Sequence, residues 1–249
     1  MNVAAAMERA VAALDLDALG RRYRDQGELV FIERALPDAL VAALAAETRR
    51  AAAAAVRHHA PGFRRAGTVP HRRLVGAAPL ATATYQAPAV IELLAHLTRA
   101  ARGVSPPAPT ATAHLYHYSR AGDRMGFHRD ACSRCDHTAQ TVIFGLIDAS
   151  TQRLICKVPG GELRLATAPG AMVVFNASRV EHAVSPLGAG EERAVVCASY
   201  ARQPRTSTLD RLIASAQEEV LFGGLRALVR SRWWSSEPAA HAARRKAPG

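Results

Sequence analysis

Residues 159–200 read PGGELRLATAPGAMVVFNASRVEHAVSPLGAGEERAVVCASY. Short runs rich in apolar residues alternate here with Pro-Gly and Gly-Ala-Gly turn signals, as is typical of short antiparallel strands. The same texture begins near Ala111, and the predicted strands cover residues 113–118, 141–146, 163–166, 172–175 and 193–200. Because little helical pattern separates them, they predict an antiparallel sandwich or barrel and not a parallel sheet with crossover helices.

The chain before this strand-rich half is predicted to be mostly helical. Apolar residues at helical spacing predict helices over residues 3–19, from Pro37 to about residue 60, and over 91–101. A short β-rich run at 29–32 separates the first two helices. Residues 62–76 hold Gly, Pro and several arginines without periodicity, and we interpret them as a loop.

We therefore expect one domain over residues 1–235, in which a barrel core (111–201) lies between a helical part (1–110) and a C-terminal helix (202–235). A disordered basic tail (236–249) is expected to follow. No apolar run is long enough to cross a membrane, and charged residues interrupt the apolar pattern at the N-terminus. Few, clustered cysteines do not suggest a disulfide framework. These features predict a cytoplasmic protein.

The net charge of +11 raises the question of a nucleic-acid partner. Nearly every basic residue is an arginine, and the arginines are scattered along the chain. Solvated surface charge is the better interpretation of such a pattern, so a nucleic-acid partner is disfavoured.

Three residues in the strand-rich half could bind one metal ion. His128 and Asp130 are two residues apart, so in an extended segment both side chains point to one face. His182 follows the predicted strand 172–175 and a short loop. Two imidazoles and one carboxylate form the facial triad that suits ferrous iron. The tripeptide alone is a weak signal, because a surface His beside a turn Asp arises by chance in many chains.

Arg193 lies eleven residues after His182, at the start of an apolar strand. A guanidinium in this position is costly unless it is paired, and a dicarboxylate offers it a bidentate partner. The alternative is a structural ion pair with Glu191 or Glu192, which the sequence leaves open.

The ordered set of motifs resembles the iron(II)/2-oxoglutarate-dependent oxygenases, and most closely their prolyl-hydroxylase-like branch. Residues 118–130 (YSRAGDRMGFHRD) resemble the Tyr, Gly and His-x-Asp entry of the family, and residues 159–200 resemble its second half. The resemblance covers residues 111–201. It implies a double-stranded β-helix, a jelly-roll barrel with the N-terminal helices packed outside.

Carried over to this sequence, the resemblance implies that His128, Asp130 and His182 bind iron(II). Arg193 would bind the distal carboxylate of 2-oxoglutarate, with Tyr118 beside it and Thr141 hydrogen-bonded to it. Tyr118 and Thr141 are otherwise ordinary core or strand residues.

The intact Asp130 also bears on the reaction, because halogenating relatives carry a small residue in its place. The resemblance therefore implies hydroxylation of an unactivated C–H bond by dioxygen, while 2-oxoglutarate is converted to succinate and carbon dioxide. We expect a small-molecule substrate, such as an amino acid or a biosynthetic intermediate. A protein or nucleic-acid substrate and an inactive cupin-like binding barrel are the alternatives.

Some features remain open at this point. Cys132, Cys135 and His137 could bind a second metal ion, but a structural zinc site needs a fourth ligand, and free thiols are the simpler interpretation. The basic residues 64–73 suit an anionic substrate, although charged loops are usually only solvated. Trp233 and Trp234 could seal a core edge or a homodimer contact.

Overall fold

A computed structural model of the chain describes residues 1–99, 108–130 and 140–201. These residues belong to one compact unit, Met1–Arg205. The predicted C-terminal helix, the basic tail, Trp233, Trp234 and the Cys132–Cys135–His137 group lie outside the described residues.

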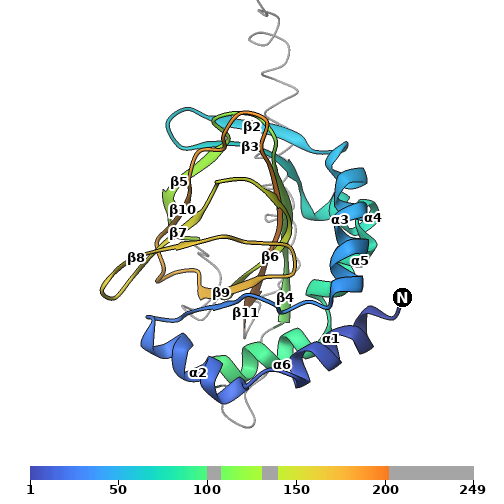
Figure 1. Cartoon of the computed structure of the whole chain (residues 1–249), viewed down its shortest axis with the longest axis vertical. Coiled ribbons are helices and arrows are strands. Elements are labelled where there is room, and N and C mark those ends of the chain that lie inside the picture. Colours follow the sequence, from blue (N-terminus) through green and yellow to red (C-terminus); the bar gives the residue numbers. More distant parts are fainter. Residues whose placement is uncertain (100–107, 131–139, 202–249) are drawn as a thin grey trace, which may run out of the picture. The chain divides into compact units, whose positions relative to one another are not determined.

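The described strands form a single mostly antiparallel sheet that curls into a nearly closed barrel (Figure 1). Its order is β1-β9-β6-β11-β4-β3-β5-β10-β7-β8, and β2 pairs with β3 at the side. The predicted jelly-roll class is confirmed. The strands are β1 (Leu29–Ile32), β2 (Val56–Ala60), β3 (Arg64–Val69), β4 (Ala108–Tyr118), β5 (Arg124–His128), β6 (Gln140–Ala149), β7 (Leu154–Val158), β8 (Gly161–Leu165), β9 (Met172–Asn176), β10 (His182–Val184) and β11 (Glu192–Ala201).

The helices lie outside the barrel (Figure 1) and form one apolar core with the outward-facing residues of β9, β6, β11 and β4. This arrangement confirms the predicted outer helical layer. The helices are α1 (Val3–Ala12), α2 (Leu16–Asp25), α3 (Asp38–Ala52), α4 (His71–Ala77), α5 (Pro79–Tyr85) and α6 (Pro88–Leu97).

Strand alternation divides the core into two clusters. On β6, Val142 and Phe144 pack against the helices, whereas Ile143 faces the barrel interior. Successive strand residues point to opposite faces. The residues of β9 and β11 that pair with β6 therefore alternate in the same way between the helix-facing cluster and the interior cluster. The inner face therefore holds a small apolar cluster together with the polar residues of the candidate site.

The predicted elements of the N-terminal part were partly wrong. The expected helix 3–19 is two helices, because Asp15 interrupts it and its carboxylate accepts a hydrogen bond from the Ala18 amide, which caps α2. The helix predicted from Pro37 to about residue 60 ends at Ala52, and the expected loop 62–76 contains β3 and α4. Pairing with β4 favours the strand here. This pairing is a tertiary contact, so it produces no periodic pattern of apolar residues by which the strand could be recognised in the sequence.

Three further strands have no clear pattern in the sequence. Strands β5, β7 and β10 are short and lie on the opposite side of the barrel from the helices (Figure 1). The register between β5 and β10 pairs His128 with His182. The barrel therefore brings these two histidines together across 54 residues of sequence.

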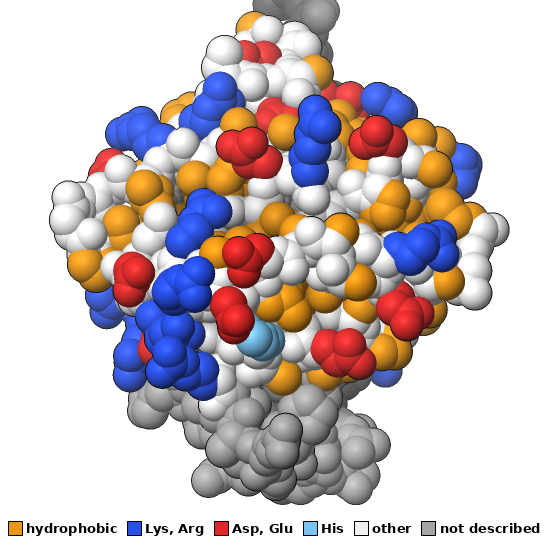
Figure 2. All heavy atoms as spheres, turned by 60° about the horizontal axis from the view of Figure 1, so that its bottom comes forward, with side chains coloured by type: hydrophobic (Ala, Val, Ile, Leu, Met, Phe, Trp, Pro, Cys, Tyr) orange, Lys and Arg blue, Asp and Glu red, His pale blue; other side chains and the backbone are white. Residues whose placement is uncertain are grey.

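The face that carries α1, α2 and α6 shows acidic, basic and apolar side chains mixed together, with one denser group of basic side chains (Figure 2). A hollow of about 510 Å³ on this face is lined by Arg21, Arg24 and Arg99, and also by the ion pair between Asp17 and His96. None of the helices among the described residues has the length and apolarity required to span a membrane.

Candidate metal centre

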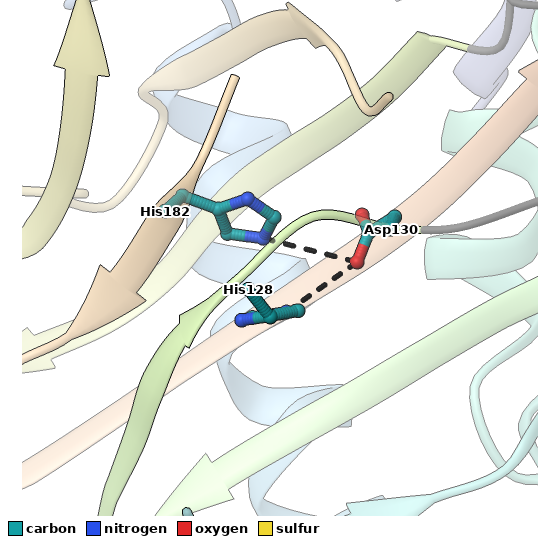
Figure 3. A group of neighbouring side chains, drawn as sticks. All are labelled: His128, Asp130 and His182. Atoms are coloured by element: carbon teal, nitrogen blue, oxygen red, sulfur yellow. Dashed lines mark ion pairs between the residues drawn. The ribbon is translucent and has the colours of Figure 1, made fainter. Parts of the chain in front are cut away.

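The predicted metal ligands point toward one another from neighbouring segments of the barrel (Figure 3). His128 is the last residue of β5, His182 is the first residue of β10, and Asp130 lies two residues beyond the end of β5. One ligand atom from each residue lies within 4.8 Å of the others. Among the described residues this is the one His, Cys, Asp and Glu group with such an arrangement.

The backbone orients both imidazoles. Nδ1 of His128 lies 2.9 Å from the carbonyl oxygen of Gly126, and Nδ1 of His182 lies 3.2 Å from that of Val180. A ring that donates its Nδ1 proton to a carbonyl has its lone pair on Nε2. Both Nε2 atoms face the same carboxylate oxygen, Oδ1 of Asp130, at 3.4 and 3.9 Å.

The carboxylate of Asp130 is held from its other side. Its Oδ2 accepts a hydrogen bond of 2.9 Å from the Thr141 hydroxyl, and its backbone amide donates to the Ala177 carbonyl at 3.0 Å. The two carboxylate oxygens therefore have different roles, since Oδ2 is positioned by the protein and Oδ1 points between the histidines. Direct contact between Thr141 and a cosubstrate stays a prediction.

The electrostatics of the three residues suit cation binding. Burial alone would raise the pKa of Asp130, but the hydrogen bond from His128 and the nearby imidazoles lower it, so the carboxylate is ionised. Burial lowers the pKa of His182, which favours the neutral ligand form. Burial also opposes protonation of His128, yet the interaction with Asp130 outweighs it and raises the pKa. A cation bound between them would interact favourably with the two imidazole nitrogens and with the Asp130 carboxylate, which otherwise face one another directly.

Aromatic rings enclose the two histidines. Phe63, in the turn between β2 and β3, meets His128 edge-on with 5.5 Å between ring centroids. Phe175 of β9 lies 4.7 Å from His182 by the same measure. Two imidazole nitrogens and one carboxylate oxygen are the donor set that suits ferrous iron, so these residues fit the metal that the resemblance implies.

Arg193 is buried inside the barrel, with a relative exposure of 1%. Its Nε donates to the Thr167 hydroxyl at 2.8 Å, its Nη1 donates to the Gln152 side-chain oxygen at 3.3 Å, and its guanidinium lies 5.3 Å from the centroid of the Tyr118 ring. Nη2 has no hydrogen-bond partner among the described residues.

The alternative ion pair of Arg193 with a neighbouring glutamate does not form. The carboxylate of Glu191 accepts from the amides of Thr151 and Gly188, and that of Glu192 pairs with His117 on the outer face. A buried guanidinium without a carboxylate partner is costly, and burial lowers the pKa of Arg193 accordingly. The unpaired Nη2 would be satisfied by the carboxylate of a bound acid.

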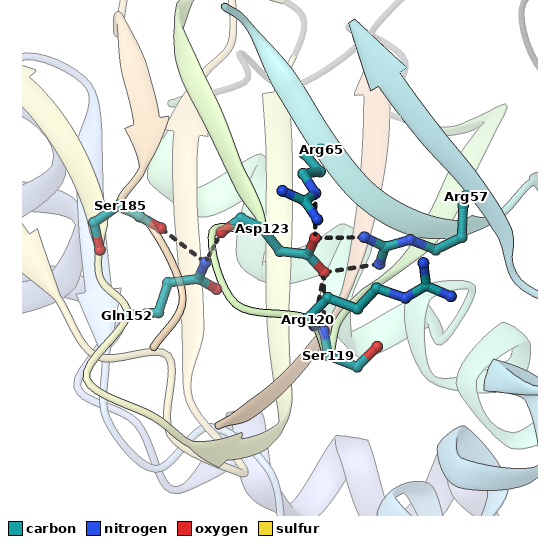
Figure 4. A network of polar contacts seen from close by, with 7 residues as sticks. All are labelled: Arg57, Arg65, Ser119, Arg120, Asp123, Gln152 and Ser185. Carbon is teal, nitrogen blue, oxygen red and sulfur yellow. Dashed lines mark hydrogen bonds and ion pairs between the residues drawn. The ribbon is translucent and has the colours of Figure 1, made fainter. Parts of the chain in front are cut away.

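A polar network holds Gln152, the residue that accepts a hydrogen bond from Arg193 (Figure 4). The Gln152 amide nitrogen donates to the carbonyl oxygens of Asp123 and Ser185, at 2.9 and 2.8 Å. The fully buried Asp123 carboxylate forms a bidentate ion pair with Arg57 and also lies 3.7 Å from Nε of Arg65. The position of the Gln152 oxygen, and hence of Arg193, depends on this network.

Gln152 and Thr167 could not be identified from the sequence. Each lies in a connection between strands, and neither forms part of a spaced motif. Gly145 gives an indirect signal, because a Cβ at this position would lie 2.4 Å from the Thr167 carbonyl oxygen and 2.1 Å from that of Ala168. A glycine in the middle of an apolar strand indicates that another backbone segment approaches closely.

The sequence matches no protein-family model and no curated protein. Solved structures do match. SnoN, an α-ketoglutarate-dependent epimerase of nogalamycin biosynthesis, was solved with Fe³⁺, α-ketoglutarate and nogalamycin RO; it is 18% identical, with a TM-score of 0.63 over 75% of this chain and 83% of that one. The chain has the fold of the iron(II)/2-oxoglutarate-dependent oxygenases.

Two bacterial structures show the same fold. A Pseudomonas putida prolyl-4-hydroxylase is 22% identical, with a TM-score of 0.53 over 76% of this chain and 99% of that one. A 2OG-Fe(II) oxygenase-family oxidoreductase from Burkholderia pseudomallei is 15% identical, with a TM-score of 0.60 over 77% and 93%. At these identities the likeness establishes the fold, in agreement with the jelly-roll barrel predicted from the sequence.

Proposed function

We propose that this chain is an iron(II)- and 2-oxoglutarate-dependent oxygenase that hydroxylates an unactivated C–H bond of a small molecule. The observation that carries the proposal is the convergence of three ligand atoms, from His128, Asp130 and His182, within 4.8 Å of one another. The buried Arg193 is the second element of the proposed site, because its Nη2 has no partner among the described residues.

In this proposal His128 and His182 would bind iron(II) through Nε2, and Asp130 would bind it through Oδ1. The Gly126 and Val180 carbonyls hold the imidazoles in the required tautomer, and Thr141 holds the carboxylate. Bound iron and 2-oxoglutarate would supply the oxidising chemistry by using dioxygen, with release of succinate and carbon dioxide. The protein holds and orients these components.

Arg193 binds the distal carboxylate of the cosubstrate in this assignment. Thr167 and Gln152 fix two edges of its guanidinium, which leaves Nη2 directed to an incoming acid. The ring of Tyr118 covers one face of the guanidinium and separates it from bulk solvent. A buried, pre-oriented cation binds a carboxylate without further ordering of side chains.

Metal analysis and cosubstrate turnover test the proposal. Anaerobically purified protein should bind iron(II) stoichiometrically, and it should form succinate from 2-oxoglutarate when air is admitted. His182→Ala and Asp130→Ala should lose both properties. His117→Ala is a matched control, because His117 pairs with Glu192 on the other face of the sheet. Wild-type protein that neither binds iron(II) nor binds 2-oxoglutarate would leave only the inactive binding barrel.

Product analysis distinguishes hydroxylation from another oxidative outcome, since SnoN shares the fold and is an epimerase. A hydroxylated product carries one oxygen atom from ¹⁸O₂, which mass spectrometry detects. A product of unchanged mass formed together with succinate would contradict hydroxylation and indicate epimerisation. The assignment of iron(II) and 2-oxoglutarate as cofactors would still hold.

A further inference from the structure

The inner face of β4 carries two tyrosines, and each lies against an arginine. Arg193 of β11 lies over Tyr118, at 5.3 Å from the ring centroid. Arg64 of β3 lies over Tyr116, at 5.1 Å. Tyr116 and Tyr118 are two residues apart on one strand, so both arginine–tyrosine pairs face the barrel interior. The proposed function uses only the first of these pairs.

The register of β3 directs the Arg64 side chain along this face. Thr68 of β3 lies opposite Tyr116 of β4, and Arg64 shares a face with Thr68 because the two are four positions apart on one strand. Nη2 of Arg64 donates to the Thr68 hydroxyl at 2.8 Å, and Thr68 is fully buried. Arg64 is thus only partly exposed, although it lies in a stretch of sequence that resembles a solvated basic loop.

Arg64 borders the same region as the proposed metal ligands. Phe63, the residue before it, contacts the ring of His128. Tyr116 and Cys197 both pack against the inner apolar cluster. Burial raises the pKa values of both side chains, the charge of Asp130 raises them further, and the charge of Arg64 lowers them. The region around Arg64 therefore adjoins the metal centre. Its positively charged side chain is Arg64, not the Arg193 of the proposed cosubstrate site.

We propose that Arg64 is a specificity-determining residue that binds a carboxylate of the primary substrate, beside the metal centre. This inference rests on the proposed function and adds the substrate class. The guanidinium would pair with the carboxylate while Tyr116 covers one of its faces and Thr68 fixes one of its nitrogens. The substrate would then be an amino acid, free or N-acylated, bound through its carboxylate.

The surroundings of Arg64 favour a carboxylate over a phosphate. His114 faces the same region, and burial together with the charges of Arg64 and His71 lowers its pKa to about 3. Burial also lowers the pKa of His71. Both imidazoles are therefore mainly neutral near pH 7, which leaves Arg64 as the permanent positive charge among these residues. One cation balances a carboxylate better than a doubly charged phosphate.

Matched pairs of acids and amides test this inference. Protein loaded with Mn²⁺ and saturating 2-oxoglutarate is titrated calorimetrically with the twenty amino acids, their N-acetyl derivatives and the primary amide of each. We expect at least one acid to bind roughly tenfold or more tightly than its amide. Arg64→Gln should remove this difference, Arg64→Lys should restore part of it, and Arg73→Gln, an exposed arginine of α4, should leave it unchanged.

The titration of 2-oxoglutarate into the Mn²⁺-loaded protein separates this inference from the proposed function. Failure of the wild type to bind 2-oxoglutarate contradicts the proposed function. Normal 2-oxoglutarate binding combined with equal affinity for acids and amides, or with no binding of any acid, overturns the role of Arg64 alone. An Arg64→Gln variant that melts like the wild type and loses 2-oxoglutarate affinity instead would place Arg64 in the cosubstrate site and would also overturn it.

Discussion

The guanidinium of Arg193 lies over the ring of Tyr118, and the two residues are register partners on β11 and β4. This pairing explains how a permanently charged side chain is tolerated in the barrel interior. Thr167 and Gln152 satisfy two of its nitrogen atoms, and the aromatic ring covers its face. Nη2 is the nitrogen that has no hydrogen-bond partner among the described residues, and its position defines where an acid would bind.

Arg193→Gln should abolish high-affinity binding of 2-oxoglutarate. The loss of a charge-assisted contact with a carboxylate predicts a dissociation constant about a hundredfold higher, measured by calorimetry on Mn²⁺-loaded protein. Iron(II) binding should persist, because Arg193 does not contact the metal ligands. Arg164→Gln, in the exposed β7–β8 hairpin, is the control, and equal losses in the two variants would contradict the assignment.

Gln152→Glu should weaken 2-oxoglutarate binding and stabilise the ligand-free protein. A carboxylate at this position would pair with Arg193 internally and compete with the acid. We expect a higher melting temperature without ligand and roughly a tenfold lower affinity for 2-oxoglutarate. Gln152→Ala should reduce affinity without raising the melting temperature. A Gln152→Glu variant that binds 2-oxoglutarate as tightly as the wild type would show that Gln152 does not position Arg193.

Thr141→Val distinguishes two roles for this hydroxyl. If Thr141 positions Asp130, as its 2.9 Å hydrogen bond suggests, the variant should bind iron(II) about tenfold more weakly. Affinity for 2-oxoglutarate at saturating metal should then be unchanged, and Thr141→Ser should restore the metal affinity. The opposite pattern, normal metal binding with weakened 2-oxoglutarate binding, would support the direct cosubstrate contact predicted from the family resemblance.

Asp123→Asn should make the fold less stable in a pH-dependent manner. Burial alone would raise the pKa of Asp123, but hydrogen bonds from Arg57 and from two backbone amides lower it below 3.8, its ordinary value. The ionised carboxylate therefore stabilises the folded state above that pH, and this contribution is lost as the pH falls through the lowered pKa. The free energy of unfolding of the variant should be about 3 kcal/mol lower than that of the wild type at pH 7.

Urea denaturation at pH 7 and at pH 3 measures this effect. The difference between wild type and Asp123→Asn should shrink at the lower pH, because the unfolded wild-type chain takes up a proton at Asp123 below pH 3.8 whereas the folded carboxylate, with its lowered pKa, resists protonation. Asp25→Asn, at an exposed position near the end of α2, should change stability little at either pH. A difference for Asp123→Asn that grew with acidification would contradict the ion-pair explanation.

Gly145→Ala should disturb both the fold and the proposed cosubstrate site. The new Cβ would lie 2.1 Å from the Ala168 carbonyl oxygen, so the segment that carries Thr167 would have to move. We expect a loss of several kcal/mol in stability, together with weaker 2-oxoglutarate binding. Phe144→Leu, a neighbouring core change of β6, should lower stability without specifically weakening 2-oxoglutarate binding.

The sequence by itself determined the class of fold and the three proposed metal ligands. Apolar strand runs and turn residues are local signals, and they predicted the barrel half of the chain. The two-residue spacing of His128 and Asp130 is local as well, and the ordered motifs placed His182 and Arg193 after them. These features depend on neighbours in the chain, so they could be recognised without coordinates.

Only the tertiary structure decided which residues surround these ligands. Strand β3 forms where a loop was expected, because pairing with β4 outweighs a segment of weak local preference. That pairing turns Arg64 from a residue of a basic stretch into an inward-facing cation over Tyr116. Gln152 and Thr167 reach Arg193 from distant connections, and their contacts follow from barrel closure, which no local spacing encodes.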